Sequence, residues 1–102
     1  IGETIGEALI REVKEETNLT VKEKRYFCSL PNKYRYSDFD VPTLDAFFVC
    51  KVEDETVLKA ADDVEEAMWL PLSEVHTEQF GLRSIRQALY DFLQMESKNL
   101  KK

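Results

Sequence analysis

Three glutamates within five consecutive positions constrain this chain more than any other feature of its sequence. Glu12, Glu15 and Glu16 are three or four residues apart, so on a helix they share one face. Like charges at these spacings cost roughly 0.2–0.5 kcal/mol per pair. A divalent cation such as Mg²⁺ binds carboxylate oxygens and would reverse the sign of that cost. Because the cost is small, an ordinary solvated helix face is the alternative interpretation.

The flanking residues predict a helix with both ends defined. Thr4 and Glu7 have the spacing of a capping box, which predicts a start at about Ile5. We expect the helix to run to Glu16 and to end at Asn18, because Asn tolerates the left-handed conformation that follows many helix ends. The acids border the apolar stripe of this helix, so we expect them at the rim of a cleft.

The same stretch resembles the signature box of the Nudix hydrolases. Glu3 is followed by seven residues and then by Arg11-Glu12-Val13-Lys14-Glu15-Glu16-Thr17-Asn18-Leu19. This matches the fixed positions of the family pattern except at Asn18, where the family has Gly. The Gly that opens the box would fall upstream of Ile1. We therefore expect residues 1–102 to form a single Nudix-like domain that is truncated at its N-terminus.

The resemblance implies a fold and a reaction. The fold is an α–β–α sandwich around a mixed sheet, in the α/β (α+β) class, and its first strands would lie upstream of this chain. The reaction is attack of water at phosphorus in a nucleoside diphosphate linked to another moiety, with Mg²⁺ or Mn²⁺ as cofactor.

The resemblance also implies roles for the side chains of the box. The expected metal ligands are Glu12, Glu15 and Glu16. The expected catalytic residues are Glu12, Arg11 and Glu15. Arg11 would orient the acids by charge-assisted hydrogen bonds, and Glu3 would pair with Arg11 and support the start of the helix.

Charge and composition narrow the class of partner. The net charge is −6, with 43% hydrophobic and 33% charged residues, as in an ordinary globular domain. An acidic protein does not attract nucleic acid or an anionic membrane, so a phosphate substrate would need a cation as mediator. No window approaches the ~20 apolar residues of a membrane span. Cys28 and Cys50 lack a metal-binding spacing and indicate reduced, buried thiols in a cytoplasmic protein.

Hydrophobic patterning predicts two strands after the helix. They are expected over 20–30 and 44–52, the second buried on both faces because it is almost continuously apolar. Between them, residues 29–43 contain Pro31 and Pro42 and predict a loop or an irregular hairpin tip.

The C-terminal third predicts one short strand and one long helix. The strand is expected over 67–71, and Ser73 would cap a short turn of helix after it. Apolar residues at a spacing of three and four predict an amphipathic helix over 82–95. The charged tail 96–102 is expected to fray.

Two further groups of side chains are candidates for the site. Tyr34, Tyr36 and Phe39 are aromatic residues in a predicted loop, and they could stack on a nucleobase or pack on the core. Many family members carry a further carboxylate before their last strand. Asp63 or Glu66 could fill that role here, or the acidic stretch around them is a solvated turn.

The choice of substrate rests on two short segments. Residues 30–34 and 42–45 are similar to those of Nudix proteins that act on ADP-ribose or NADH, which favours such a substrate. The alternatives are a Nudix-like module that binds a nucleotide without cleaving it, and an inactive truncated fragment. The intact carboxylates argue against the first, and the missing Gly supports the second. The resemblance also admits a homodimer.

Overall fold

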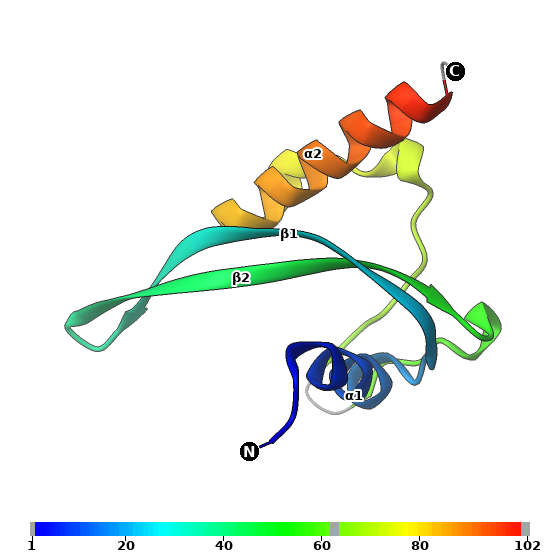
Figure 1. Cartoon of the computed structure of the whole chain (residues 1–102), viewed down its shortest axis with the longest axis horizontal. Helices are drawn as coiled ribbons and strands as arrows, with labels where there is room; N and C mark the ends of the chain where they lie inside the picture. The colour runs from blue at the N-terminus through cyan, green and yellow to red at the C-terminus, as the bar shows by residue number, and fades with distance from the viewer. Residues whose placement is uncertain (1, 62–63, 101–102) are drawn as a thin grey trace. The chain divides into compact units, whose positions relative to one another are not determined.

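The computed structural model describes residues 2–61 and 64–100, which form an α+β structure (Figure 1). In chain order the elements are α1 (Ile5–Thr17), β1 (Val21–Tyr36), β2 (Phe39–Val52), the 3₁₀ helices η1 (Glu55–Val57), η2 (Leu72–Glu74) and η3 (Thr77–Gln79), and α2 (Arg83–Leu100). β1 and β2 pair as an antiparallel hairpin, and this is a two-stranded sheet within the described residues. The predicted α+β class is confirmed.

The chain divides into two compact units. Unit 1 is Ile1–Arg25 with Phe48–Trp69, and it holds α1 and the ends of the hairpin that are far from its turn. Unit 2 is Tyr26–Phe47 with Leu70–Lys102, and it holds the turn of the hairpin and α2. Both strands therefore contribute residues to both units.

α1 begins and ends where the sequence predicts. The hydroxyl of Thr4 accepts a hydrogen bond from the Glu7 N–H at 3.0 Å, and the Glu7 carboxylate accepts one from the Thr4 N–H at 3.1 Å. This reciprocal pair is the expected capping box. Asn18 follows the helix with φ 64°, in the left-handed conformation, and its N–H donates to the Lys14 carbonyl at 3.0 Å.

The segment after η1 runs beside the C-terminal end of α1. The Lys59 N–H donates to the Thr17 carbonyl at 3.0 Å, and the Ala61 N–H donates to the Glu16 carbonyl at 3.1 Å. These bonds use carbonyls that the last turn of a helix cannot satisfy internally. They attach the chain just before the acidic stretch to the end of the box helix.

Residues 29–43 form the tip of the β1–β2 hairpin, which is one of the two structures predicted for them, whereas the loop predicted as the other is wrong except at the turn. β1 continues through Pro31, β2 includes Pro42, and the turn consists of Ser37 and Asp38, with Ser37 at φ 54°. Proline was a misleading signal because it is tolerated in a strand whose N–H faces an unpaired edge. In the described sheet each strand has one such edge.

The predicted strand over 44–52 lies within β2, but its predicted burial on both faces is wrong. The side chains of residues 45–50 are half-buried, and Leu44 is 72% exposed. An apolar run of this length suits a central strand, yet β2 has a single strand neighbour among the described residues.

The region between the hairpin and α2 also differs from expectation. Residues 67–71 are not a strand; Trp69 instead donates its indole N–H to the Glu55 carbonyl at 2.8 Å. η2 forms where a helical turn was expected, but no side chain caps it. α2 extends to Leu100, so the predicted fraying from Glu96 is wrong for that part of the tail; residues 101–102 lie outside the described residues.

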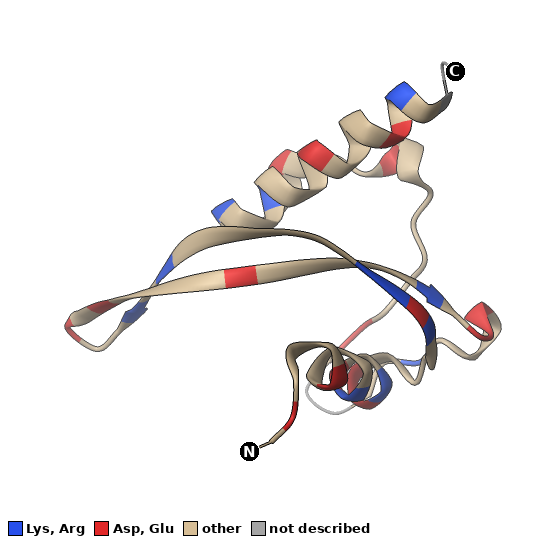
Figure 2. Ribbon diagram, in the orientation of Figure 1, with Lys and Arg blue, Asp and Glu red and all other residues tan. Residues whose placement is uncertain are grey.

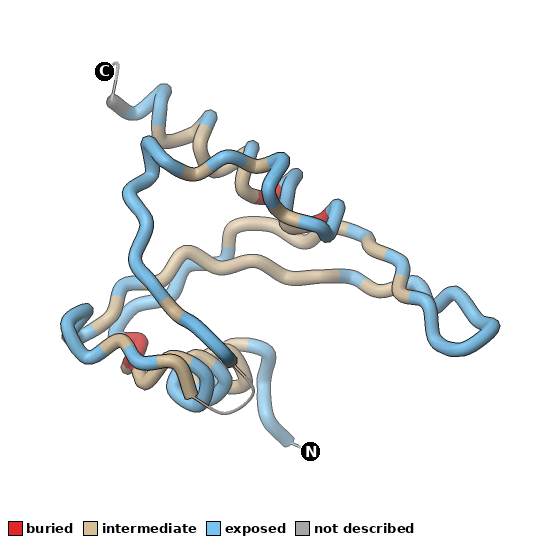
Figure 3. Tube along the Cα trace, turned by 180° about the vertical axis from the view of Figure 1, so that it is seen from behind, coloured by how far each residue is buried: buried red, intermediate tan, exposed pale blue. Residues whose placement is uncertain are grey.

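Few of the described side chains are fully buried (Figure 3). Leu19 and Val21 form the buried apolar part of unit 1, and Ala88 lies buried on α2 in unit 2. In unit 2, Phe27 and Phe92 meet edge to face, with ring centroids 6.0 Å apart. None of the described helices combines the length and the apolar character needed to cross a membrane.

Candidate active site

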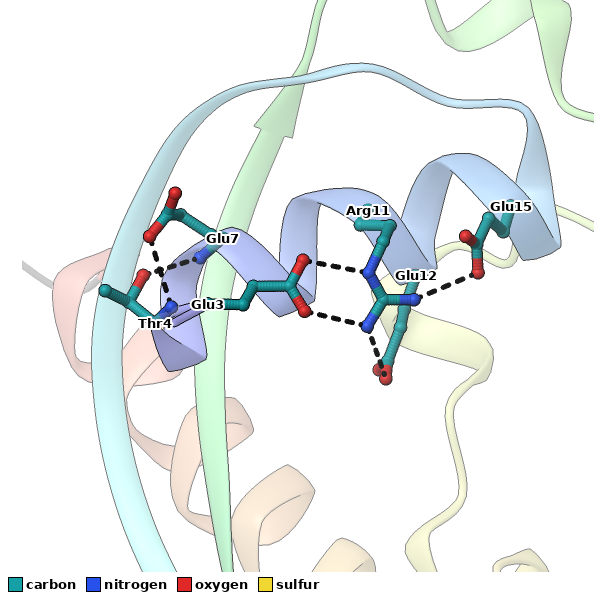
Figure 4. A network of polar contacts seen from close by, with 6 residues as sticks. All are labelled: Glu3, Thr4, Glu7, Arg11, Glu12 and Glu15. Atoms are coloured by element: carbon teal, nitrogen blue, oxygen red, sulfur yellow. Dashed lines mark hydrogen bonds and ion pairs between the residues drawn. The ribbon is translucent and has the colours of Figure 1, made fainter. Parts of the chain in front are cut away.

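Arg11 gathers the acids of α1 into one polar network (Figure 4). Its Nε donates to Glu3 Oε2 at 2.9 Å and its Nη2 donates to Glu3 Oε1 at 3.0 Å, which is a two-pronged charge-assisted contact. Its Nη1 donates to Glu15 Oε2 at 3.2 Å, and its Nη2 lies 3.8 Å from Glu12 Oε1. The contacts expected between Arg11 and both Glu3 and Glu15 are therefore present.

The network shifts the pKa of Glu3 and of Arg11. The hydrogen bonds from Arg11 lower the pKa of Glu3, and Glu3 in turn raises the pKa of Arg11. The side chains of Arg11 and Glu3 are 46% and 34% exposed, so water screens their attraction and its contribution to folding is small. Its consequence is orientation: Glu3 holds the guanidinium in place, and that group holds one oxygen of Glu15.

Glu12, Glu15 and Glu16 are all exposed on α1. The side chain of Glu16 makes no hydrogen bond or ion pair within residues 2–61 and 64–100, although its carbonyl accepts the Ala61 N–H. The described side chains include no group of three or more Asp, Glu, His or Cys arranged to hold a metal ion. Figure 2 shows acidic and basic segments following one another along α1.

The donor set of α1 nevertheless fits a hard cation by its chemistry. Carboxylate oxygens are the ligands that Mg²⁺ takes, and it retains several waters, so one or two carboxylates from a protein can suffice. Glu12 and Glu16 lie one turn apart and are exposed, and neither donates to nor accepts a side-chain hydrogen bond in the described part of the chain. These two carboxylates have the most oxygens left for an ion.

Of the two further acids predicted for the site, the structure describes Glu66, which forms no hydrogen bond or ion pair with this network. Glu66 is exposed and belongs to unit 1, like α1. Asp63 lies outside the described residues. The bonds from Lys59 and Ala61 to the end of α1 are the structural link between this stretch and the box helix.

The three aromatic candidates lie on strands near the turn of the hairpin, not in a loop. Tyr36 and Phe39 are 62% and 72% exposed, so packing on the core does not account for them. Tyr34 is half-buried, and its side chain helps to lower the pKa of Asp45. All of them belong to unit 2.

The polar cluster around Asp45, to which Tyr34 belongs, was not predicted from the sequence. The Ser84 hydroxyl donates to Asp45 Oδ2 at 2.6 Å, and Asn32 Nδ2 lies 3.2 Å from the same oxygen and 3.0 Å from Ser84 Oγ. These hydrogen bonds, with others from Thr43 and Tyr34, lower the pKa of Asp45. The signal was Asp45 itself, a lone acid in an apolar strand, which requires hydrogen-bonding partners when it is removed from water.

Comparison with protein families gives a match to the profile described as NUDIX domain over residues 1–92. The match runs from the box through most of α2, so the chain belongs to the Nudix family, and the resemblance seen in the box is confirmed. This places the chain in a family of the pyrophosphohydrolase type whose members bind nucleoside diphosphate substrates. Comparisons with curated proteins and with solved structures give no match.

Proposed function

We propose that residues 1–102 form one Nudix domain that hydrolyses the diphosphate of a nucleoside diphosphate linked to another moiety, with Mg²⁺ or Mn²⁺ as cofactor. The observation that carries this proposal is the Arg11 network, in which Glu3 fixes the guanidinium that orients Glu15, while Glu12 and Glu16 stay exposed beside it. ADP-ribose or NADH is the favoured substrate class, on the similarity of residues 30–34 and 42–45 noted above.

Each residue of the box has a stated role in this proposal. Glu12, Glu15 and Glu16 would hold the cation, which when bound neutralises phosphate oxygens and lowers the pKa of a coordinated water. We also assign to Glu12 the acceptance of a proton from the attacking water; it lies 3.8 Å from Arg11 and makes no hydrogen bond to it. Arg11 keeps Glu15 oriented, and Glu3 keeps Arg11 oriented.

The test is release of AMP from ADP-ribose in the presence of Mg²⁺. Replacing Glu12 or Glu15 by Gln should reduce turnover about 100-fold or more, since a positioned acid or base alone contributes 10²–10⁴-fold. Glu78→Gln, an exposed acid in η3, is the matched control and should leave turnover unchanged. Equal rates for Glu15→Gln and the unmodified protein would rule out the ligand assignment.

Recognition of the base is assigned to Tyr34, Tyr36 and Phe39. Phe39→Ala and Tyr36→Ala should raise KM for ADP-ribose with little change in kcat, because the base on which they would stack is remote from the diphosphate bond that breaks. Glu66→Gln and Asp63→Asn test the further carboxylate in the same assay. A variant that lowers kcat would identify the acid that acts in the reaction.

The alternative is a module that binds the nucleotide without cleaving it. The intact carboxylates of the box, Glu12, Glu15 and Glu16, argue against it. Binding of ADP-ribose without product release, in the presence of Mg²⁺ or Mn²⁺, would establish it.

We further propose a reducing, cytoplasmic setting, because both cysteines are free thiols whose pKa is raised by burial.

A further inference from the structure

A cavity in unit 2 has the lining of a ligand site and shares no residue with the box helix. It is open to solvent on one side and has a volume of about 440 Å³, within the ~300–1,000 Å³ usual for small-molecule sites. It lies between β1 and the beginning of α2, and these two elements supply its lining: Leu30, Pro31, Asn32, Lys33, Arg83, Ser84 and Gln87.

The charge of this lining is opposite to that of the chain. The chain has 20 acidic and 14 basic residues, yet the cavity is lined by two cations and by no acid. Lys33 and Arg83 are exposed and form no ion pair within residues 2–61 and 64–100. Two cations without acidic partners at one cavity favour an anionic ligand.

Two acids lie next to the lining of the cavity, and both are hydrogen-bonded: Asp45 to Ser84 and Asp91 to Gln87. Ser84 is 1% exposed and donates to Asp45 at 2.6 Å. Asn32 Nδ2 lies within hydrogen-bond distance of both Ser84 and Asp45, and its Oδ1 accepts the Lys33 N–H at 2.8 Å. Asp45 and Asp91 therefore have hydrogen-bond partners other than Lys33 and Arg83, which pair with neither of them.

We propose that this cavity binds a small organic phosphomonoester. The guanidinium of Arg83 matches the geometry of a phosphate oxygen pair, and the ammonium of Lys33 supplies a second positive charge for a dianion. Leu30 and Pro31 provide an apolar wall for the organic part of the molecule. The proposal uses no residue of α1 and no metal ion, although Leu30 to Lys33 of the lining also belong to the segment 30–34 on which the choice of substrate rests.

The test is a titration of the full chain with AMP in the presence of EDTA. Binding is monitored by the NMR chemical shifts of the backbone amides of the residues that line the cavity. Arg83→Gln and Lys33→Gln should each weaken the affinity about 10-fold or more, the effect of losing a hydrogen bond to a charged group. Arg86→Gln on α2 and Lys22→Gln on β1 are matched controls, since both are exposed and neither lines the cavity.

The ligand series separates the two halves of the proposed site. AMP should bind more tightly than inorganic phosphate, which lacks the organic part, and adenosine should show no saturable binding because it lacks the phosphate. Adenosine that binds as well as AMP would overturn the anion assignment. If inorganic phosphate binds as well as AMP, the proposed contact between the apolar wall and the organic part of the ligand is wrong.

A final arm separates this cavity from the box helix, because AMP is also the expected product of the proposed hydrolase. AMP should bind Glu15→Gln as it binds the unmodified chain and should bind Arg83→Gln more weakly. Loss of binding in Glu15→Gln, with binding retained in Arg83→Gln, would assign the AMP site to α1 and overturn the cavity proposal. Turnover that fails in every form of the protein leaves this comparison unaffected.

Discussion

At the scale of single residues, Asn18 shows how a side chain substitutes for glycine at the end of a helix. Its backbone has φ 64°, and its Nδ2 donates to the Val57 carbonyl at 3.0 Å. Glycine would adopt this conformation without strain but could not make that bond. The departure of the box from its family pattern is therefore matched by a contact to the segment after β2.

Replacing Asn18 separates these two contributions. Asn18→Ala loses the bond and places a β-carbon in the left-handed region, so the free energy of unfolding should fall by about 2 kcal/mol. Asn18→Gly loses only the bond and should cost about 1 kcal/mol or less. Urea denaturation of the two variants measures the difference. A smaller loss for Ala than for Gly would contradict the role of the backbone conformation.

Asp45 makes stability depend on pH. The hydrogen bond from Ser84, the largest cause, holds the folded-state pKa of Asp45 below its ordinary value of 3.8. A depressed carboxylate pKa stabilises the folded state above the unfolded pKa, and this stabilisation is lost as the pH falls through 4 and below. Urea midpoints between pH 7 and 3 should therefore fall less steeply for Asp45→Asn. Identical acid limbs would show that the cluster does not discriminate between the charged and neutral acid.

The separation in sequence between contacting residues explains which contacts could be predicted from the sequence. The capping box and the contact from Arg11 to Glu15 join residues three and four positions apart, which helical geometry makes neighbours. The contact from Arg11 to Glu3 spans eight positions, and Glu3 precedes α1, so it was predicted from the family resemblance. The cluster of Asp45 joins residues 13 and 39 positions apart. Such pairs depend on how β1, β2 and α2 pack, which periodicity does not specify.

At the scale of elements, α1 offers two substitutions of opposite sign. Thr4→Ala removes the capping hydroxyl and should lower the free energy of unfolding by about 1 kcal/mol. Gly6→Ala should raise it by up to about 1 kcal/mol, because alanine favours the helix. A β-carbon there would meet only the flexible end of the Lys24 side chain, which can move away. Thermal unfolding by circular dichroism measures both; destabilisation by Gly6→Ala would mean that Lys24 cannot move.

The hairpin shows where local signals mislead. Pro31, Pro42 and two aspartates, Asp38 and Asp40, favour a loop, and this composition is usual for loops. The turn itself was marked only by Ser37 and Asp38, and Ser37 adopts φ 54° without being glycine or asparagine. Strand pairing over most of residues 29–43 comes from contacts along the partner strand, which a reading of each segment by itself cannot detect.

At the scale of the whole molecule, the exposed apolar surface and the net charge both affect folding stability. Among the described residues Leu19, Val21 and Ala88 are the buried hydrophobic side chains, while Trp69 and Leu44 are among many exposed ones. A two-stranded hairpin is marginally stable by itself and requires helices or further strands to cover it. Folding of this chain should therefore respond measurably to any ligand that binds only the folded state.

Mg²⁺ gives the sharpest test of that response, because the net charge of −6 also makes the chain sensitive to salt in general. At about ten times its dissociation constant, an ion bound at the box should add about 1.4 kcal/mol to the free energy of unfolding. KCl at matched ionic strength measures screening alone.

Glu12→Gln separates specific binding of Mg²⁺ from screening. Removing the like charge beside Glu15 and Glu16 should raise stability without metal by a few tenths of a kcal/mol, at ~0.2–0.5 kcal/mol per pair. The same change should abolish the gain on adding Mg²⁺, so the two effects have opposite signs. Glu78→Gln changes the net charge equally, and it should keep the gain. An equal gain from Mg²⁺ in the unmodified chain and in Glu12→Gln would mean that the ion acts only through screening, and α1 would then be a solvated helix face.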